Sequence, residues 1–134
     1  MSERLHILVI DDDPQFVETV TTLLGSVGYR TSYTYHVGKA VEFAKKEKPD
    51  LILLDVMFID QPGPDGITLS MQLHDNPEVR NIPVIMLSGI KQVVDFPYEY
   101  TPDPTYMPVK AFLDKPIKPD KLLAEIERAI GPRD

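Results

Sequence analysis

The 134-residue sequence contains no cysteine and is poor in positive charge. The lack of cysteine excludes disulfide bonds, thiolate nucleophiles and thiolate metal sites, and it fits a reducing compartment. Lys and Arg number 14 against 21 Asp and Glu, so the net charge is −7. Because nucleic-acid binding depends on basic surface that displaces counterions, this balance argues against a nucleic-acid partner.

Long hydrophobic runs are also missing. None approaches the roughly 18 residues that a membrane-spanning helix needs. Near the N-terminus, Leu5–Ile10 is followed at once by three aspartates, which is unlike a signal peptide. We therefore expect a soluble, cytoplasmic protein without a membrane partner. A chain of this length suits one domain, residues 1–134, with a core from about residue 5 to residue 130.

Short apolar runs alternate with segments of helical periodicity. Runs of this kind are typical of strands that are buried on both faces, and a polar run is typical of an edge strand. We expect buried strands at Leu5–Ile10, Leu51–Leu54, Val84–Leu87 and Ala111–Leu113, and an edge strand at Arg30–Tyr35.

Helices are expected between these strands. Apolar residues recur at helical spacing from Phe16 to Val27 and from Leu122 to Ile130, and Asp120 is expected to open the last helix. Two further helices are expected at Lys39–Lys48 and from Asp65 to Leu73. Alternating strands and helices predict an α/β fold with a mostly parallel, doubly wound sheet and right-handed crossovers.

Polar side chains directly follow the four apolar strands: Asp11, Asp12 and Asp13, then Asp55, then Ser88, then Lys115. Ligands of open parallel sheets lie beyond these carboxyl ends of the strands. Taken singly, each residue has an ordinary explanation: Asp13 before Pro14 is a helix cap, and the others suit turns or solvated strand ends. Taken together, the acids point to a site, because converging carboxylates repel one another unless a cation is bound.

The chemistry of such a site can be stated. Carboxylate ligands with open positions suit Mg²⁺ or Mn²⁺. A carboxylate can also attack phosphorus and form an aspartyl phosphate. A metal ion, a lysine and a hydroxyl could then neutralise and position the phosphoryl group.

At this point the sequence resembles a known family. Residues 7–14, Ile-Leu-Val-Ile-Asp-Asp-Asp-Pro, resemble the opening of bacterial response-regulator receivers, the family of the chemotaxis protein CheY. The other landmarks of that family match in order, each at a strand end: Asp55, Ser88 and the pair Lys115-Pro116. The resemblance covers about Leu5 to Ile130. It implies a flavodoxin-like (β/α)5 fold with five parallel strands in the order 2-1-3-4-5.

The resemblance also implies a role for each acid. Asp55 corresponds to the phosphoacceptor. Asp11 and Asp12 correspond to the acidic pair that binds Mg²⁺ together with Asp55. Met57 corresponds to the residue whose backbone carbonyl completes the metal site.

Three other positions carry over from the family. Ser88 corresponds to the hydroxyl that turns toward the phosphoryl group, and Lys115 to the lysine that pairs with it. Phe112 falls where the family has a rotating aromatic switch residue, although a buried strand aromatic needs no such role. The resemblance further implies a cis bond between Lys115 and Pro116.

The function implied is a signalling module of a two-component system. It would take a phosphoryl group from a histidine kinase or phosphotransfer protein and catalyse only its own phosphorylation and dephosphorylation. Because the receiver accounts for the whole chain, output would pass through an unknown downstream protein or a phosphorelay. Two alternatives remain: a phosphorylation-independent scaffold, and a metal-dependent phosphatase with an aspartate nucleophile. The second alternative would require the motif D-x-D-x-T after the first strand. Residues 11–15 match its two aspartates but have Gln15 in place of the threonine.

Two segments depart from the family pattern. The stretch from Asp55 to Asp65 is about three residues longer than is usual in the family, so the position of Met57 depends on its nearness to Asp55. The stretch from Ile90 to Pro108 contains four prolines where a fourth helix is expected. Because proline breaks helices, we predict no regular helix past Phe96 and a remodelled partner-binding surface.

The histidines suggest no metal site. His6, His36 and His74 lack the spacing of metal ligands, and we interpret them as structural or exposed. Alternating tyrosines occur at Tyr33/Tyr35 and Tyr98/Tyr100. Given the negative charge of the chain, these are expected to cover core or surface rather than to stack nucleic-acid bases.

Overall fold

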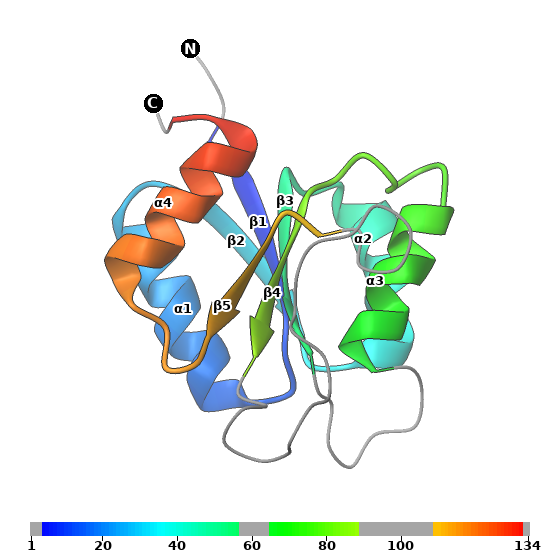
Figure 1. Cartoon of the computed structure of the whole chain (residues 1–134), viewed down its shortest axis with the longest axis horizontal. Coiled ribbons are helices and arrows are strands. Elements are labelled where there is room, and N and C mark those ends of the chain that lie inside the picture. The colour runs from blue at the N-terminus through cyan, green and yellow to red at the C-terminus, as the bar shows by residue number, and fades with distance from the viewer. Residues whose placement is uncertain (1–3, 57–64, 89–108, 133–134) are drawn as a thin grey trace.

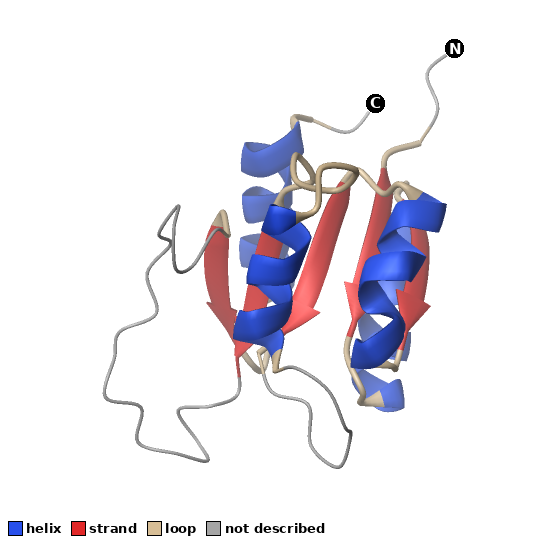
Figure 2. Cartoon of the chain, turned by 90° about the vertical axis from the view of Figure 1, so that its right-hand side faces the viewer, coloured by secondary structure: helices blue, strands red, loops and turns tan. Residues whose placement is uncertain are grey.

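A single parallel sheet organises the chain in the computed structural model, which describes residues 4–56, 65–88 and 109–132. The five strands are β1 (His6–Ile10), β2 (Arg30–Thr34), β3 (Leu51–Asp55), β4 (Val84–Ser88) and β5 (Ala111–Asp114). Every neighbouring pair is parallel, and the arrows in Figure 2 point the same way. The strand order is β2-β1-β3-β4-β5. The predicted fold class and strand order are confirmed.

Helices cover both faces of this sheet. They are α1 (Pro14–Ser26), α2 (Ala40–Glu47), α3 (Gly66–Asp75) and α4 (Pro119–Ile130), and a 3₁₀ turn at Val37–Lys39 leads into α2. Figure 1 shows α1 and α4 on one face of the sheet and α2 and α3 on the other. This is the doubly wound arrangement that alternating strands and helices predict.

The apolar composition of the central strands follows from this two-sided cover. Every residue of β1, β3 and β4 is buried. Side chains alternate between the faces of a strand, so Ile7 and Val9 of β1 pack with the α1 and α4 cluster, whereas Leu8 and Ile10 pack with the α2 and α3 cluster. With apolar side chains needed on both faces, the polar residues of these strands are confined to their first or last positions, as at His6, Asp55 and Ser88.

Short-range hydrogen bonds fix where the first helix begins and ends. Asp13 Oδ1 accepts a hydrogen bond of 3.1 Å from the backbone N–H of Gln15, and Pro14 takes the first helical position. This is the predicted cap. At the other end, Gly28 follows the helix with a φ of +104°, a conformation that favours glycine.

The last helix differs from its expected start by one residue. α4 begins at Pro119, and Asp120 lies within its first turn instead of opening the helix. Lys118 stands at the N-cap without a side-chain hydrogen bond. The fixed φ of proline suits the first helical position and removes an N–H that would have no helical partner there, so Pro119 determines this start.

Two predictions concern residues outside the described ranges. Met57 and the whole segment Ile90–Pro108 lie outside them, so the proposed carbonyl ligand and the proline-rich surface stay predictions. Within the described residues, no helix has the length and apolar character needed to cross a membrane.

Candidate functional site

The parallel sheet brings the polar strand ends to one edge. Asp11 and Asp12 directly follow β1, Asp55 is the last residue of β3, and Ser88 is the last residue of β4. Lys115 directly follows β5. The carboxyl ends of parallel strands meet at the same edge, so the order of the strands gathers residues that are far apart in the sequence.

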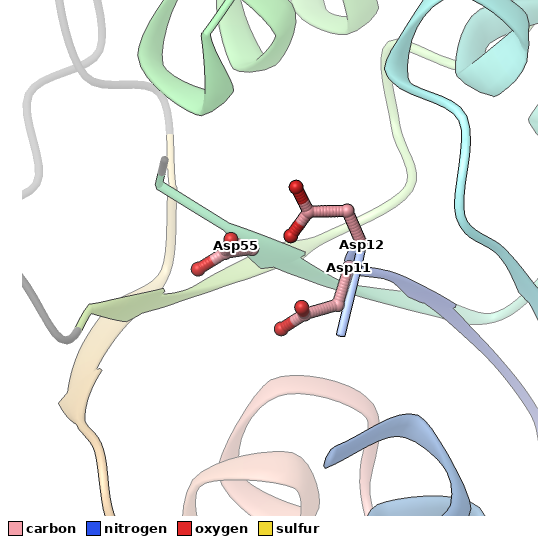
Figure 3. Close-up of side chains that lie close together, drawn as sticks. All are labelled: Asp11, Asp12 and Asp55. Carbon is pink, nitrogen blue, oxygen red and sulfur yellow. The ribbon is translucent and has the colours of Figure 1, made fainter. Parts of the chain in front are cut away.

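Three carboxylates meet at this edge. Asp11, Asp12 and Asp55 each offer an oxygen atom, and these atoms all lie within 4.8 Å of one another (Figure 3). Asp11 is fully buried, Asp55 is 6% exposed and Asp12 is half-buried. The expected convergence of the acids is therefore present in the structure.

A lysine lies between two of these acids. Lys115 Nζ is 2.7 Å from Asp11 Oδ2 and 3.3 Å from Asp55 Oδ1. Its side chain is 22% exposed, so the ammonium group has limited contact with water. This one ammonium offsets one of the three negative charges and leaves an excess of acid.

The electrostatics of the cluster show this excess. Burial, and then the neighbouring charge of Asp11, raise the pKa of Asp55 to about 7, although Lys115 opposes the shift. Burial likewise raises the pKa of Asp11. Burial would lower the pKa of Lys115, but the carboxylates of Asp11 and Asp55 outweigh it and the pKa is raised. A further cation at this edge would favour the ionised form of the acids.

The three consecutive aspartates have three different surroundings. Asp11 Oδ1 accepts a hydrogen bond of 3.0 Å from the backbone N–H of Asp13, while Asp11 Oδ2 contacts Lys115. Asp13 caps α1 through its own side chain. The carboxylate of Asp12 points toward that of Asp55 (Figure 3). The helix cap therefore accounts for Asp13, as expected, and does not account for the other two.

A glycine allows α3 to begin directly against the end of β3. The backbone N–H of Gly66 donates a hydrogen bond of 2.7 Å to the carbonyl oxygen of Val56. A Cβ atom at Gly66 would overlap the carbonyl oxygen of Asp55. The preceding residue, Asp65, caps the helix by accepting a 2.7 Å hydrogen bond from the N–H of Thr68. The Asp-Gly pair thus starts a helix at this place and lets its backbone approach the backbone of Asp55 and Val56 closely.

Two residues to which the resemblance gives a switching role, Ser88 and Phe112, lie on β4 and β5. Ser88 is buried at the end of β4, and its carbonyl oxygen accepts a 2.9 Å hydrogen bond from the N–H of Lys115. Phe112 pairs with Met86 in the sheet and packs, partly buried, against the α2 and α3 cluster. The peptide bond between Lys115 and Pro116 is cis, as predicted. The switching roles of Ser88 and Phe112 stay predictions.

One contact of the site was missed at the sequence level. The ring centroid of Phe16 is 4.1 Å from Lys115 Nζ. The periodicity of the sequence placed Phe16 on the apolar face of the first helix and said nothing about its neighbours. The sequence did contain a signal for this contact. Phe16 lies three residues after Asp13, in the first turn of α1, and this turn starts at the end of the sheet where the acids lie.

The donor atoms fit a hard divalent cation. The cluster offers carboxylate oxygens, which are the ligands preferred by Mg²⁺ and Mn²⁺, and no sulfur. Asp12 is half-buried, so the cluster is open on one side to water or to a phosphoryl oxygen. The residues therefore fit a Mg²⁺ or Mn²⁺ ion, which Asp11, Asp12 and Asp55 would hold.

Comparison with known sequences identifies the family. Residues 7–127 match the response regulator receiver domain. The chain is 32% identical over 125 residues to the DNA-binding response regulator MtrA of Mycolicibacterium smegmatis, covering 92% of this chain and 49% of MtrA. It is 28% identical to protein PilH of Pseudomonas aeruginosa, covering 94% of this chain and 98% of PilH. The chain spans about half of MtrA and less of several other relatives, such as 19% of the response regulator PleD of Caulobacter vibrioides.

Solved structures show the same fold. The receiver domain of a signal transduction histidine kinase from Syntrophus aciditrophicus is 29% identical, with a TM-score of 0.75 over 93% of this chain and 89% of that one. The receiver domain of sensor histidine kinase PA1611 from Pseudomonas aeruginosa, which has a magnesium ion in its active site cleft, aligns with a TM-score of 0.78 at 24% identity over 97% of this chain and all of that one. With this fold and with the family match across most of its length, the chain belongs to the response regulator receiver domains of two-component signalling systems.

Proposed function

We propose that Asp55 is the phosphoacceptor of this receiver and that its phosphorylation controls the output of the chain. The observation that carries the proposal is the position of the Lys115 ammonium group. It lies 2.7 Å from Asp11 and 3.3 Å from Asp55, at the open edge of the sheet. A buried carboxylate beside a positive charge suits attack on a phosphoryl group, because the charge that develops is neutralised in place.

The reaction needs little from the protein besides positioning. An oxygen of Asp55 forms a bond to phosphorus while the bond from phosphorus to the donor breaks, and the bonding electrons leave with the donor. Lys115 then pairs with a phosphoryl oxygen. The hydroxyl of Ser88, which is buried at the end of the next strand, is proposed to donate to another.

The metal ion is assigned to the acidic cluster. We assign Mg²⁺, or Mn²⁺ in its place, to Asp11, Asp12 and Asp55, with the carbonyl of Met57 as the further ligand that the family pattern implies. Bound there, the ion would neutralise negative charge on the phosphoryl oxygens. What supports the assignment is the close approach of three carboxylates, beside which residues 4–56, 65–88 and 109–132 place one ammonium group, that of Lys115.

Signal output is proposed to start at Ser88 and Phe112. A hydroxyl that turns toward the phosphoryl group vacates space next to β4, and Phe112 on the neighbouring strand is half-buried against the core. An inward turn of Phe112 would change the surface around β5. The partners proposed are a histidine kinase or phosphotransfer protein as donor and a downstream protein as receiver of the signal.

Two other functions fit the structure less well. A scaffold that works without phosphorylation has no need for buried acids with raised pKa values, yet Asp11 and Asp55 are both retained. An aspartate-dependent phosphatase needs a second acid two residues after its nucleophile. If Asp11 were that nucleophile, the second acid would be Asp13, whose side chain caps α1 instead.

Small phosphodonors test the proposal directly. Incubation with acetyl phosphate or phosphoramidate and Mg²⁺ should add one phosphoryl group by intact mass, and Asp55→Asn should abolish the addition. Asp13→Asn is the matched control, because asparagine caps helices as well as aspartate and Asp13 is outside the proposed metal site. An unchanged mass in the wild-type protein, or an equal loss in Asp13→Asn, would contradict the assignment.

A further inference from the structure

The contacts of the Lys115 ammonium include three groups within the described residues. Two are the carboxylates of Asp11 and Asp55, at 2.7 and 3.3 Å. The third is the ring of Phe16, which lies under the ammonium with 4.1 Å from Nζ to the ring centroid. A cation within about 6 Å of an aromatic centroid is attracted by the electron-rich face of the ring.

These contacts differ in what phosphorylation does to them. On phosphorylation Asp55 becomes an acyl phosphate, whose negative charge lies on the phosphoryl oxygens and no longer on the carboxyl group, and Asp11 is assigned to the metal ion. Lys115 must therefore exchange both carboxylate partners for a phosphoryl oxygen. The attraction to Phe16 does not depend on either acid and is unchanged through this exchange.

Lys115 needs such a contact because its side chain is long and flexible. Lysine carries its charge on a four-carbon stem with many rotamers, and the Lys115 side chain is 22% exposed, so water is accessible to it. The contact with the Phe16 ring opposes an outward turn of an ammonium that Asp11 and Asp55 have released.

Phe16 is itself held in place. It lies in the first turn of α1, whose start is fixed by the side chain of Asp13 and by Pro14. The next residue, Val17, is 1% exposed, and Phe16 packs against the same cluster that α1 and α4 bury. The ring is therefore a rigid surface beside a flexible cation.

We propose that Phe16 is a positioning residue for Lys115, and that its ring face keeps the ammonium in the site while the carboxylate partners of Lys115 are replaced. This role rests on the proposed phosphorylation of Asp55. The competing explanation is that Phe16 only continues the apolar face of α1. The two explanations depend on different properties of the ring. A packing role depends on its size, whereas a positioning role depends on its electron density.

Fluorination of the ring separates these properties. Phenylalanine with one, two or three ring fluorines, placed at position 16, keeps nearly the same size but weakens the attraction to a cation. The rate of phosphorylation by phosphoramidate should fall stepwise, by about three- to tenfold in total, which corresponds to about 0.6–1.4 kcal/mol. The same series at Phe43, which packs on the other face of the sheet, should leave the rate unchanged. A phosphorylation rate that fluorination at position 16 leaves unchanged, or that fluorination at position 43 lowers equally, overturns the proposal.

A second measurement uses the metal-free, unphosphorylated protein. In NMR spectra, the resonances of the Lys115 ε-methylene should be shifted upfield by the aromatic ring. The shift should persist in Phe16→Tyr and disappear in Phe16→Leu. Unshifted Lys115 resonances in the wild-type protein would overturn the proposal, whether or not the protein accepts phosphate.

A double-mutant comparison links the two residues. Phe16→Leu should slow phosphorylation of the wild-type protein but should have no further effect in Lys115→Ala, because the ring then has no cation to hold. An equal slowing in both backgrounds would make Phe16 a packing residue. Failure of the proposed function is distinct from all of these, since the wild-type protein would then gain no phosphoryl group at all.

Discussion

Lys115 Nζ lies 2.7 Å from Asp11 Oδ2, although the two residues follow strands β5 and β1, which are separated by two other strands in the sheet. The lysine thus extends across the end of the sheet to an acid assigned to the metal ion. An ammonium group in that position competes with a divalent cation for Asp11 and also repels it.

Removal of this ammonium should strengthen metal binding. We expect Lys115→Met to bind Mg²⁺ about tenfold more tightly at pH 8, because both the competition for Asp11 and the repulsion are lost. Isothermal titration calorimetry would measure the affinity. Lys121→Met, which removes an exposed lysine of α4, is the control for net charge. Equal affinities in wild type and Lys115→Met would show that Lys115 does not compete with the metal.

The raised pKa of Asp55 predicts a gain in stability for Asp55→Asn in metal-free buffer. Its folded pKa is about 7, against 3.8 for an ordinary aspartate. Between these values the folded protein binds the additional proton, so the free energy of unfolding falls as pH rises from about 4 to 7. Asparagine has no such charge. Asp55→Asn should therefore be more stable than wild type by about 2–4 kcal/mol at pH 8, with a difference near zero at pH 4.

Urea unfolding at the two pH values would measure this difference. Asp75→Asn, at an exposed aspartate that ends α3, is the control and should show no such change with pH. A destabilised Asp55→Asn at pH 8 would mean that Lys115 stabilises the ionised acid more than burial destabilises it.

Much of the site could be predicted because the strands are buried on both faces. In β1 and β3 no polar residue is tolerated in the central part, so Asp11 and Asp55 mark the strand ends in the sequence itself. The contacts of Lys115 with both Asp11 and Asp55, the shorter of them to Asp11, could not be predicted, because they depend on side-chain geometry across several strands. The contact of Phe16 with Lys115 could not be predicted either. The helical spacing of apolar residues in α1 is the same whether the Phe16 ring contacts a cation or only the core.

Because of His6, the free energy of unfolding should decrease when the pH is lowered below about 6.5. Its imidazole is 4% exposed, with Nδ1 2.9 Å from an Arg30 guanidinium nitrogen and Nε2 2.8 Å from Ser32 Oγ. Arginine only donates, so Nδ1 accepts and the proton sits on Nε2. Burial, and then the charge of Arg30, lower the pKa of His6. The unfolded chain therefore binds a proton more readily, and stability decreases as pH falls below about 6.5.

The measurement of this effect requires the opposing titration of Asp55 to be removed. In an Asp55→Asn background, urea unfolding between pH 7.5 and 5.5 should show a decrease in stability that His6→Gln flattens. His74→Gln, at an exposed histidine of α3, should leave the decrease in place. A decrease of the same size without His6 would assign it to other groups.

Gly66 should be the glycine least tolerant of a side chain among those of the described residues. Its added Cβ would overlap the carbonyl oxygen of Asp55 and lie 2.7 and 2.8 Å from the Cα and carbonyl oxygen of Val56. All of these are backbone atoms, so relief requires α3 or the end of β3 to move. At Gly25 of α1, by contrast, a Cβ would meet no atom within 4 Å outside its own helix.

The two glycines therefore form a matched pair. Helix propensity favours alanine over glycine, so Gly25→Ala should be more stable than wild type by about 0.5–1 kcal/mol. Gly66→Ala should instead be less stable by about 1–3 kcal/mol, because the steric overlap outweighs propensity. It should also slow phosphorylation, since the displaced backbone carries Asp55. Urea unfolding and the rate with phosphoramidate would check both effects. A Gly66→Ala protein with wild-type stability and rate would show that α3 can draw back from Asp55 freely.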